Sequence, residues 1–352
     1  MLDSDVESAF AHWGPRFITQ GMDSNDFSRV GASVTDWKNW LTTWTKNGDM
    51  HAGLATQAQR TGHGLTAGNA WLQAALNYHF AKFVWVLDMD RNREATQLAI
   101  DALANAHRFL DPTAVRLEIP FEGTKLVGNL RFPLGVLTPP LVILLPGLDS
   151  TKEEFFHWEN NFLTRGLATF SMDGPGQGEV GFSLPLRYDY DVATSAVLDF
   201  LATRTDINSE RIGIAGVSMG GYYAARSAAC DQRIKAVVTV GGPYENGSRF
   251  DARPEISRSA FIAYSRSESH LEAKRLAERM SLEGLLGDLE QPMLIIFGKK
   301  DRLVPFEHAI RIASEVKNSE LVMYEEGNHV CNNLPYLYKP LAGDWLADQL
   351  RI

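Results

Sequence analysis

The first third of the chain carries a hydrophobic pattern typical of helices. Residues 67–88 (AGNAWLQAALNYHFAKFVWVLD) and 93–110 (REATQLAIDALANAHRFL) repeat apolar positions at intervals of three and four. In the second segment four such positions fall on one helical face: Ala99, Leu103, Ala106 and Leu110. Because this spacing matches the period of an α-helix, and no convincing strand pattern occurs before Pro112, we predict a helical domain over residues 1–112.

The pattern changes after Pro112. The stretches VRLEIPF and KLVGNLRFP flank a short Gly-Thr turn and predict an antiparallel hairpin. Apolar strands then alternate with amphipathic stretches, which favours a mostly parallel sheet with helices on both faces. The predicted strands are 141–146, 167–172, 211–216, 236–240, 293–297 and 320–324. Residues 113–352 are therefore predicted to form an α/β domain, with a helical insertion at about 244–290 that is longer than a simple crossover needs.

A candidate nucleophile lies where one of these strands meets a helix. Residues 211–224 (RIGIAGVSMGGYYA) pass from a β-branched segment through Gly-Val-Ser-Met-Gly into a run of small residues. A strand, a sharp turn and a helix around a Gly-x-Ser-x-Gly motif are typical of a nucleophile elbow, with Ser218 at the turn. The five-residue motif alone is weak, because it also arises by chance. Ser218 needs partners elsewhere in the chain.

The partners occur in the expected order. A serine hydroxyl needs a neighbouring base, and the base needs a group that orients it. Asp301 follows a strand in LIIFGKKDRLVP, and His329 follows the last strand in EEGNHVCN. Each could separately be a turn acid or a surface histidine, but their placement after consecutive strands matches the chain order Ser, Asp, His of an α/β-hydrolase. We therefore predict a catalytic triad of Ser218, Asp301 and His329.

Acyl transfer also requires donors for the negatively charged oxygen that develops in the transition state, and these are commonly two backbone N–H groups. One is predicted at Met219, the residue after the nucleophile. The other is predicted in the loop LPGLDSTKEEF after the first central strand, at Leu148, with Gly147 and Asp149 as neighbouring alternatives.

Composition narrows the classes of partner. The formal net charge is −9 and no basic run occurs, which argues against nucleic acid. No apolar run approaches the length of a membrane span, and the acidic N-terminal stretch does not resemble a secretory signal. The two cysteines, Cys230 and Cys331, have no metal-ligand spacing and suit a reducing compartment, although a redox role for Cys331, two residues after His329, stays open. We expect a cytoplasmic protein that acts on a small molecule.

Two motifs resemble cofactor or metal sites but lack essential parts. GQGEVG at 176–181 matches a dinucleotide-binding glycine pattern, yet Pro185 lies where that motif needs a helix. DMDRNRE at 88–94 starts like a calcium loop, but Arg93 replaces the glycine and Ala99 the bidentate glutamate, so a turn between helices is the better interpretation. Neither a metal ion nor an organic cofactor is predicted.

Several of these segments together resemble a known family. GLDSTKEEF, MDGPGQGE and GVSMGGYYAARSAA, with Asp301 and His329, are similar to the α/β-hydrolases of the 2,6-dihydroxypseudooxynicotine hydrolase type, which are related to the fermentation-respiration switch family. The resemblance implies an α/β-hydrolase fold, an N-terminal helical cap, a homodimer and hydrolysis of a carbon-carbon bond beside a carbonyl. It also implies an additional acid that assists the substrate. Glu245 in GGPYENG is the nearest acid, although a solvated loop acid is the better interpretation of this residue.

The leading hypothesis is therefore a serine hydrolase that cleaves a bond next to a carbonyl in a small aromatic or polyketide-like substrate. A carboxylesterase, lactonase or thioesterase would use the same triad. A non-catalytic binding or regulatory protein on the same scaffold is a third alternative. Aromatic residues of the helical domain could face a substrate, but most are expected in its core: Trp71, Tyr78, His79, Phe83 and Trp85.

Overall fold

The computed structural model describes residues 3–351, which divide into two compact units. The helical unit contains the described residues up to Ala114 together with 153–157 and 254–260. The sheet unit contains 115–152, 158–253 and 261–351. Contacts thus group two short segments from the later part of the chain with the N-terminal helices. The two-domain division at residue 112 itself stays a prediction.

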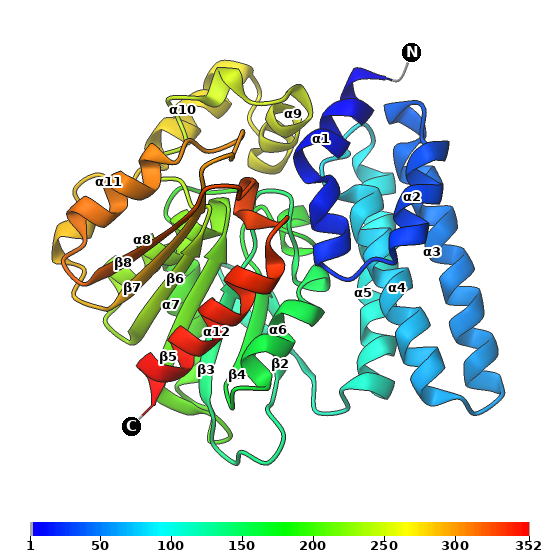
Figure 1. Cartoon of the computed structure of the whole chain (residues 1–352), viewed down its shortest axis with the longest axis horizontal. Helices are drawn as coiled ribbons and strands as arrows, with labels where there is room; N and C mark the ends of the chain where they lie inside the picture. The colour runs from blue at the N-terminus through cyan, green and yellow to red at the C-terminus, as the bar shows by residue number, and fades with distance from the viewer. Residues whose placement is uncertain (1–2, 352) are drawn as a thin grey trace. The chain divides into compact units, whose positions relative to one another are not determined.

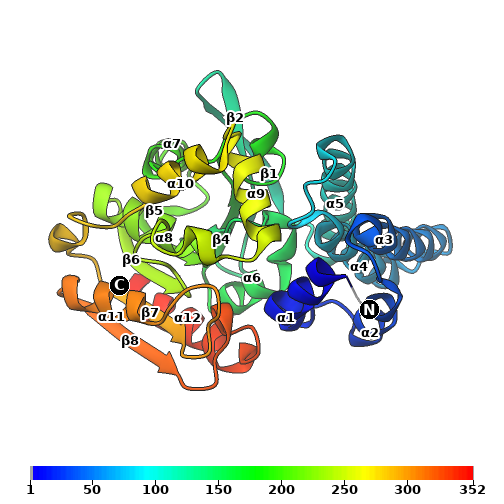
Figure 2. The ribbon, with the colours of Figure 1, turned by 90° about the horizontal axis from the view of Figure 1, so that it is seen from above.

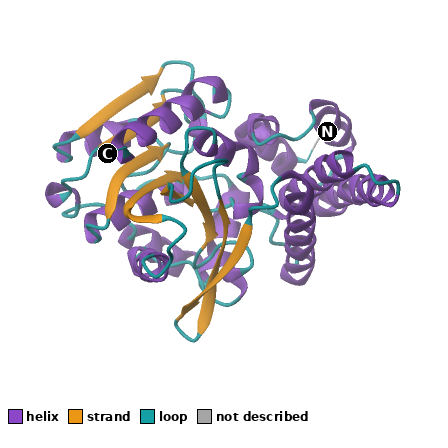
Figure 3. Cartoon of the chain, turned by 90° about the horizontal axis from the view of Figure 1, so that it is seen from below, coloured by secondary structure: helices purple, strands orange, loops and turns teal. Residues whose placement is uncertain are grey.

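The helical unit is built on five helices (Figure 1): α1 (Ser4–Thr19), α2 (Ser24–Ser33), α3 (Trp37–Arg60), α4 (Gly64–Lys82) and α5 (Met89–Leu110). Four of them begin after an aspartate whose carboxylate accepts backbone N–H groups of the first turn, and these aspartates are Asp3, Asp23, Asp36 and Asp88. Such caps satisfy amides that have no acceptor within the helix. Figure 3 shows that this part of the chain is helical throughout, as predicted from its hydrophobic period.

The predicted helical stretch 67–88 ends earlier than its pattern suggested. The helix α4 stops at Lys82, and Asp88 caps the start of α5 through the N–H groups of Asp90 and Arg91. The Asn92 side chain donates to the carbonyl oxygens of Lys82 (3.0 Å) and Trp85 (2.7 Å), which satisfies the end of α4. These side-chain contacts interrupt the helix inside a continuous apolar pattern. Residues 88–94, whose sequence starts like a calcium loop, form the cap and the first turns of α5.

Aromatic side chains fill the core of the helical unit. The rings of Phe17 and Phe80 stack with centroids 3.9 Å apart, and Phe83 meets Phe17 and Trp40 at 5.9 Å. Four of the five aromatic residues considered for substrate contact are almost fully buried in the structure: Tyr78, His79, Phe83 and Trp85. Their burial supports the interpretation that this stripe mainly packs the unit.

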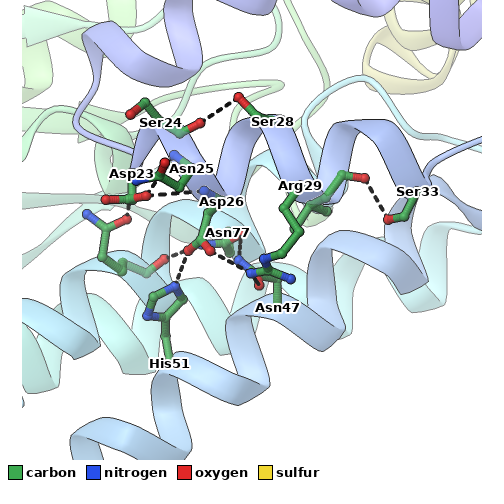
Figure 4. A network of polar contacts seen from close by, with 12 residues as sticks. Asp23, Ser24, Asn25, Asp26, Ser28, Arg29, Ser33, Asn47, His51 and Asn77 are labelled. Atoms are coloured by element: carbon green, nitrogen blue, oxygen red, sulfur yellow. Dashed lines mark hydrogen bonds and ion pairs between the residues drawn. The ribbon is translucent and has the colours of Figure 1, made fainter.

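A polar network ties α2 to α3 and α4 (Figure 4). The Asp26 carboxylate accepts from Arg29 at 2.5 Å and pairs with His51 of α3. Arg29 also donates to Asn47 (2.7 Å), whose amide donates to Asn77 of α4 at 2.9 Å. Since both amide side chains of this network, Asn47 and Asn77, have hydrogen-bond partners, the network fixes how the helices align at little desolvation cost.

A buried ionic cluster surrounds Glu154, which belongs to the helical unit. Its carboxylate accepts from Arg16 (2.5 and 3.2 Å), from Gln20 (3.1 Å) and lies 2.5 Å from Nε2 of His79. Burial by itself would raise the pKa of Glu154, but Arg16 and the contact with His79 outweigh it and hold that pKa well below its usual range. Burial lowers the pKa of His79, which favours the neutral imidazole beside the Glu154 carboxylate.

This cluster predicts that the protein loses stability in mild acid. Below the ordinary histidine pKa of 6.5 the unfolded chain binds a proton at His79 that the folded chain resists, so stability is complete above that value and falls beneath it. Between pH 7.5 and 5.5 this one group should cost about 1 kcal/mol of unfolding free energy. Urea unfolding at both pH values checks this in wild type and in His79→Gln, which keeps a donor but does not titrate. An equal pH dependence in the two proteins would contradict the assignment.

The sheet unit holds one eight-stranded sheet: β1 (Val115–Phe121), β2 (Thr124–Arg131), β3 (Pro140–Leu145), β4 (Ala168–Asp173), β5 (Asn208–Val217), β6 (Ile234–Val240), β7 (Met293–Gly298) and β8 (Ser319–Tyr324). The strand order is β1-β2-β4-β3-β5-β6-β7-β8. The hairpin β1-β2 and the pair β2-β4 are antiparallel, and the other neighbours are parallel. The six predicted strands and both strands of the predicted hairpin are confirmed.

Helices cover both faces of this sheet (Figures 1 and 2). Gly213 of β5 faces Leu346 and Leu350 of the C-terminal helix, whereas its neighbours Ile212 and Ile214 join the core cluster that contains the helix after β5. Alternate residues of a strand point to opposite faces, so the two helices lie on opposite sides. The helices that follow β3 in the chain are α6 (Phe156–Leu163), α7 (Asp191–Leu201), α8 (Met219–Cys230), α9 (Glu255–Ser265), α10 (His270–Arg279), α11 (Glu307–Glu315) and α12 (Pro335–Leu350), of which α9 and α10 belong to the insertion between β6 and β7.

Five short 3₁₀ turns complete the described elements: η1 (Lys152–Glu154), η2 (Val180–Phe182), η3 (Phe250–Ala252), η4 (Leu286–Asp288) and η5 (His329–Cys331). The predicted insertion between β6 and β7 contains η3, α9, α10 and η4. Among the described residues, no helix combines the length and the hydropathy that crossing a membrane needs.

Candidate active site

Ser218 lies at the junction between β5 and α8 in a strained backbone conformation, with φ 54° and ψ −129°. This region is unfavourable for a residue with a side chain and persists only where its surroundings hold it. The Ser218 N–H donates to the carbonyl of Val240 (2.9 Å), and its carbonyl accepts from Gly221 (2.8 Å). These two bonds hold the turn on the adjacent strand and on the first turn of the helix.

The positions of the glycines around Ser218 leave no room for a side chain. A Cβ on Gly216 would lie 1.9 Å from the carbonyl oxygen of Gly220, and a Cβ on Gly220 would lie 2.2 Å from the carbonyl oxygen of Leu145. A Cβ on Gly221 would lie 2.6 Å from the Cα of Gly242. All three neighbours are backbone atoms that cannot rotate away. The small residues of the motif therefore let α8 start directly against the ends of β3 and β6.

Asp301 follows β7 and is fixed from both sides. One carboxylate oxygen, Oδ1, accepts from the N–H groups of Leu303 (2.8 Å) and Val304 (2.9 Å). The other, Oδ2, lies 2.7 Å from Nδ1 of His329. The side chain of Asp301 is fully buried, so its orientation is set by the turn and only one oxygen is left for the imidazole.

His329 reaches Asp301 because the loops after β7 and β8 run in contact. A Cβ on Gly298 would lie 2.3 Å from the carbonyl oxygen of Gly327, and a Cβ on Gly327 would lie 2.7 Å from the Cα of Gly298. The N–H of Lys300 donates to the Gly327 carbonyl at 2.9 Å. Glycine at both positions therefore allows the approach that places the acid beside the histidine.

The turn after His329 is itself unusual. Val330 and Cys331 both have positive φ (58° and 52°), which is rare for residues other than glycine. The side chain of Asn332 donates to the His329 carbonyl at 3.1 Å. Asn328 and Asn333 exchange hydrogen bonds between backbone N–H and side-chain oxygen at 2.9 and 3.2 Å. These contacts hold the backbone of His329 in place.

The structure brings together all three residues of the predicted triad. Nε2 of His329 lies 2.8 Å from Oγ of Ser218, and Nδ1 of the same ring lies 2.7 Å from Oδ2 of Asp301. The imidazole is nearly buried. One nitrogen of a neutral imidazole donates and the other accepts. With Nδ1–H donating to the Asp301 carboxylate, Nε2 is free to accept the proton of Ser218.

The structure places one predicted oxyanion donor, Met219, next to Ser218 in the chain, and it brings the loop that contains the other, Leu148, close to Ser218. Met219 is the first residue of α8, where the backbone N–H has no acceptor within the helix and the helix dipole favours negative charge. A Cβ on Gly147 would lie 3.1 Å from Cβ and 3.5 Å from Oγ of Ser218, so the loop after β3 passes close to the hydroxyl. Leu148 follows directly, and its role as a donor stays a prediction.

Glu245 occupies a loop after β6, where its carboxylate has local partners. It accepts from the N–H groups of Gly247 (2.8 Å) and Ser248 (2.9 Å) and from the Ser248 hydroxyl. Burial opposes ionisation, but these hydrogen bonds together lower the pKa of Glu245 below its usual value. His308 lies 3.9 Å away. These contacts give Glu245 a structural role in its loop, and assistance to a substrate stays a prediction.

Cys331 is buried close to this site. Burial, with the nearby charge of Asp301, raises the pKa of its thiol to about 12. Because the thiolate is the reactive form of cysteine, this environment does not favour the redox role left open by the sequence. Cys230 is exposed, and neither thiol is in a disulfide.

The segment 173–179 contributes contacts that the sequence did not reveal. Lys152 donates from its backbone N–H (2.9 Å) and from Nζ (2.8 Å) to Asp173, and Nζ also contacts Glu179 at 2.7 Å. The two carboxylates thus hold a buried ammonium, which counts against a metal ion between them. Gln177, which belongs to both GQGEVG and MDGPGQGE, is buried and donates hydrogen bonds to the loop after β3. The glycines of this segment and its likeness to the family segment were signals in the sequence, but neither indicated these contacts.

The sheet order, the elbow between β5 and α8, and the acid and histidine after β7 and β8 define an α/β-hydrolase. The chain belongs to the esterase FrsA-like family, whose model matches residues 32–351. It is an enzyme of the hydrolase class, as its relatives and structural neighbours are.

Two relatives and one solved structure place the chain within this family. It is 33% identical over 349 residues to a 2,6-dihydropseudooxynicotine hydrolase from Paenarthrobacter nicotinovorans, covering 98% of this chain and 93% of the relative. It is 35% identical over 227 residues to the 20-hydroxy-prefusarin hydrolase FUS2 of Gibberella moniliformis, covering 60% of this chain and 53% of that protein. The crystal structure of the 2,6-dihydroxy-pseudo-oxynicotine hydrolase matches with a TM-score of 0.87 at 31% identity, covering 96% of this chain and 95% of the other. These findings confirm the predicted family and fold class.

Proposed function

We propose that this protein is a serine hydrolase in which Ser218, His329 and Asp301 carry out acyl transfer. The observation that carries the proposal is the chain of two hydrogen-bond distances, 2.8 Å from Ser218 Oγ to His329 Nε2 and 2.7 Å from His329 Nδ1 to Asp301 Oδ2. A hydroxyl, an imidazole and a carboxylate in this order are the parts that a serine nucleophile needs.

In the proposed reaction Ser218 Oγ attacks a substrate carbonyl while its proton moves to Nε2 of His329. The amides of Met219 and Leu148 stabilise the oxyanion. Collapse of this intermediate breaks the bond to the leaving group, which takes the proton from His329 and departs. Water, deprotonated by the same imidazole, then attacks the acyl group, and Ser218 recovers its proton. Asp301 keeps the imidazole in the tautomer that can accept a proton and stabilises its charged form.

The proposed substrate is a small molecule with a carbonyl beside the bond that breaks. The long match to a 2,6-dihydropseudooxynicotine hydrolase supports an aryl ketone, in which a carbon leaving group is protonated as it departs. The chain's family is described as esterase FrsA-like, which supports an ester, lactone or thioester as the second candidate substrate. A homodimer and a cytoplasmic location stay predictions.

A probe and a substrate panel test the proposal. We expect a fluorophosphonate probe to label the wild-type protein on Ser218, because the probe reacts with activated serines. We further expect aryl ketones or β-diketones to be cleaved at least as fast as short p-nitrophenyl esters, measured as kcat/KM. Folded wild-type protein that resists the probe would favour the non-catalytic alternative. Rapid ester turnover without ketone cleavage across the panel would favour the esterase alternative.

A further inference from the structure

Gln177 is a buried side chain whose four hydrogen-bonding positions are all used within the sheet unit. Its Nε2 donates to the carbonyl oxygens of Pro146 (2.7 Å) and Gly147 (3.1 Å). Its Oε1 accepts from the N–H of Gly174 (3.0 Å) and from the hydroxyl of Tyr190 (2.7 Å). An amide has two donor hydrogens and two acceptor lone pairs, so this pattern fixes which end of the side chain faces the loop after β3.

The contact with Gly147 bears directly on the Leu148 amide. A peptide unit is planar and almost always trans, so the C=O of one residue and the N–H of the next lie in one plane and point in opposite directions. A donor that holds the Gly147 carbonyl therefore also sets the direction of the Leu148 N–H. Donation to the carbonyl polarises the peptide as well, which strengthens the N–H on its other side. The bond to the Pro146 carbonyl orients the preceding peptide in the same way.

The support for Gln177 is rigid. Gly176 and Gly178, its two neighbours, have positive φ (79° and 46°), and a Cβ on Gly178 would lie 2.1 Å from Oδ2 of Asp173. The ring of Tyr190 stacks on Tyr223 of α8, with centroids 3.9 Å apart at an angle of 14°. Gln177 thus joins the loop after β3 to the loop after β4 and, through Tyr190, to α8, the helix that follows Ser218.

We propose that Gln177 is a positioning residue that aims the Leu148 N–H at the developing oxyanion. This inference rests on the proposed function, because it assigns the buried amide a part in the same acyl transfer. It also accounts for the glycine-rich segment 174–178, whose tight turns place Gln177 against the loop. Gln177 itself contacts neither Ser218 nor His329 among the hydrogen bonds of the described residues, so its effect passes through the backbone of the loop.

The test compares Gln177→Glu with a matched substitution at another buried glutamine. Glutamate keeps an oxygen for Gly174 and Tyr190 but places a second oxygen against two carbonyl oxygens. Gln291 is also buried and donates through Nε2 to the Ala228 carbonyl at 3.0 Å, near the far end of α8 from Ser218. Gln291→Glu therefore repeats the same chemical change without touching the loop after β3.

Both variants and wild type are assayed with p-nitrophenyl acetate, with a trifluoromethyl ketone that forms an anionic adduct on serine, and by thermal unfolding. Removal of an oxyanion donor typically lowers kcat by about 10²–10³-fold. A change in the direction of the Leu148 N–H should therefore lower kcat by roughly 10- to 100-fold. We expect Gln177→Glu to lose kcat and ketone affinity by similar factors with KM within about twofold of wild type. Gln291→Glu should keep both values.

Gln177→Met and Tyr190→Phe extend the test if glutamate prevents folding. The first removes both donor hydrogens without adding charge, and the second removes one support of Oε1, so we expect the larger loss of kcat and ketone affinity in the first. A folded Gln177→Met protein with unchanged kcat and ketone affinity overturns the proposal, as does an equal loss in Gln291→Glu. Wild-type protein without turnover or adduct formation overturns the proposed function, and the positioning role with it.

Discussion

Replacement of Ser218 by alanine is expected to lower kcat for any hydrolysed substrate by roughly 10⁴- to 10⁶-fold, the range seen when a triad nucleophile is removed. The reason is that the Ser218 hydroxyl, 2.8 Å from Nε2 of His329, is the nucleophile of the proposed mechanism. Labelling by a fluorophosphonate probe should disappear in the same variant. Fold stability should change by less than about 1 kcal/mol, because alanine meets the same backbone strain at φ 54° as serine does.

Ser227→Ala is the matched control for this substitution. Ser227 lies in α8, the helix that follows Ser218; it is buried, and its hydroxyl is 3.0 Å from that of Thr194. Its loss should cost about 1 kcal/mol of stability through one hydrogen bond, with kcat within about twofold of wild type. Turnover in Ser218→Ala within tenfold of wild type would show that another group is the nucleophile, and the proposed mechanism would be wrong.

Asp301→Asn is expected to lower kcat by about 10⁴-fold while the fold is retained. The asparagine oxygen can still accept from Leu303 and Val304, as Oδ1 does now. Its NH₂ group would then face Nδ1 of His329 and donate to it. The imidazole would carry its hydrogen on Nε2, toward Ser218, and could not accept the serine proton. The loss thus comes from the wrong tautomer and leaves the packing unchanged.

Steady-state kinetics and the rate of probe labelling check this result, with Asp344→Asn as the control. Asp344 is a largely exposed acid in α12 that pairs with Arg165, and its loss should leave kcat unchanged. A decrease below about tenfold in a folded Asp301→Asn protein would mean that the acid only caps its turn, which was the alternative role considered for Asp301 from the sequence.

The sequence predicted the strands well because most of them are short apolar runs between turn residues. The segments that became β3, β4 and β7 are almost entirely buried, and their boundaries differ by a residue or two from those predicted. The end of α4 was missed for the opposite reason. The apolar pattern continues through Trp85, and the side chains that stop the helix, Asp88 and Asn92, act from outside it.

Candidate site residues divide in the same way. Ser218, Asp301 and His329 could be found because each stands at a fixed place after a strand, and chain order restricts the choice. Gln177 could not be found, because a glutamine in a glycine-rich loop has no pattern of its own. Only the contact with the carbonyls of Pro146 and Gly147, about thirty residues earlier in the chain, reveals what it holds.

The amino-acid sequence by itself determined the order of helices and strands, the position of the elbow and the identity of the three residues predicted to react. These follow from local periodicity and from the small residues that a sharp turn requires. The tertiary structure decided the distances: the approach of Gly298 to Gly327, the burial of Asp301 and the grouping of residues 153–157 and 254–260 with the N-terminal helices. Such features depend on packing between segments far apart in the chain, where each contact is fixed by its neighbours in space.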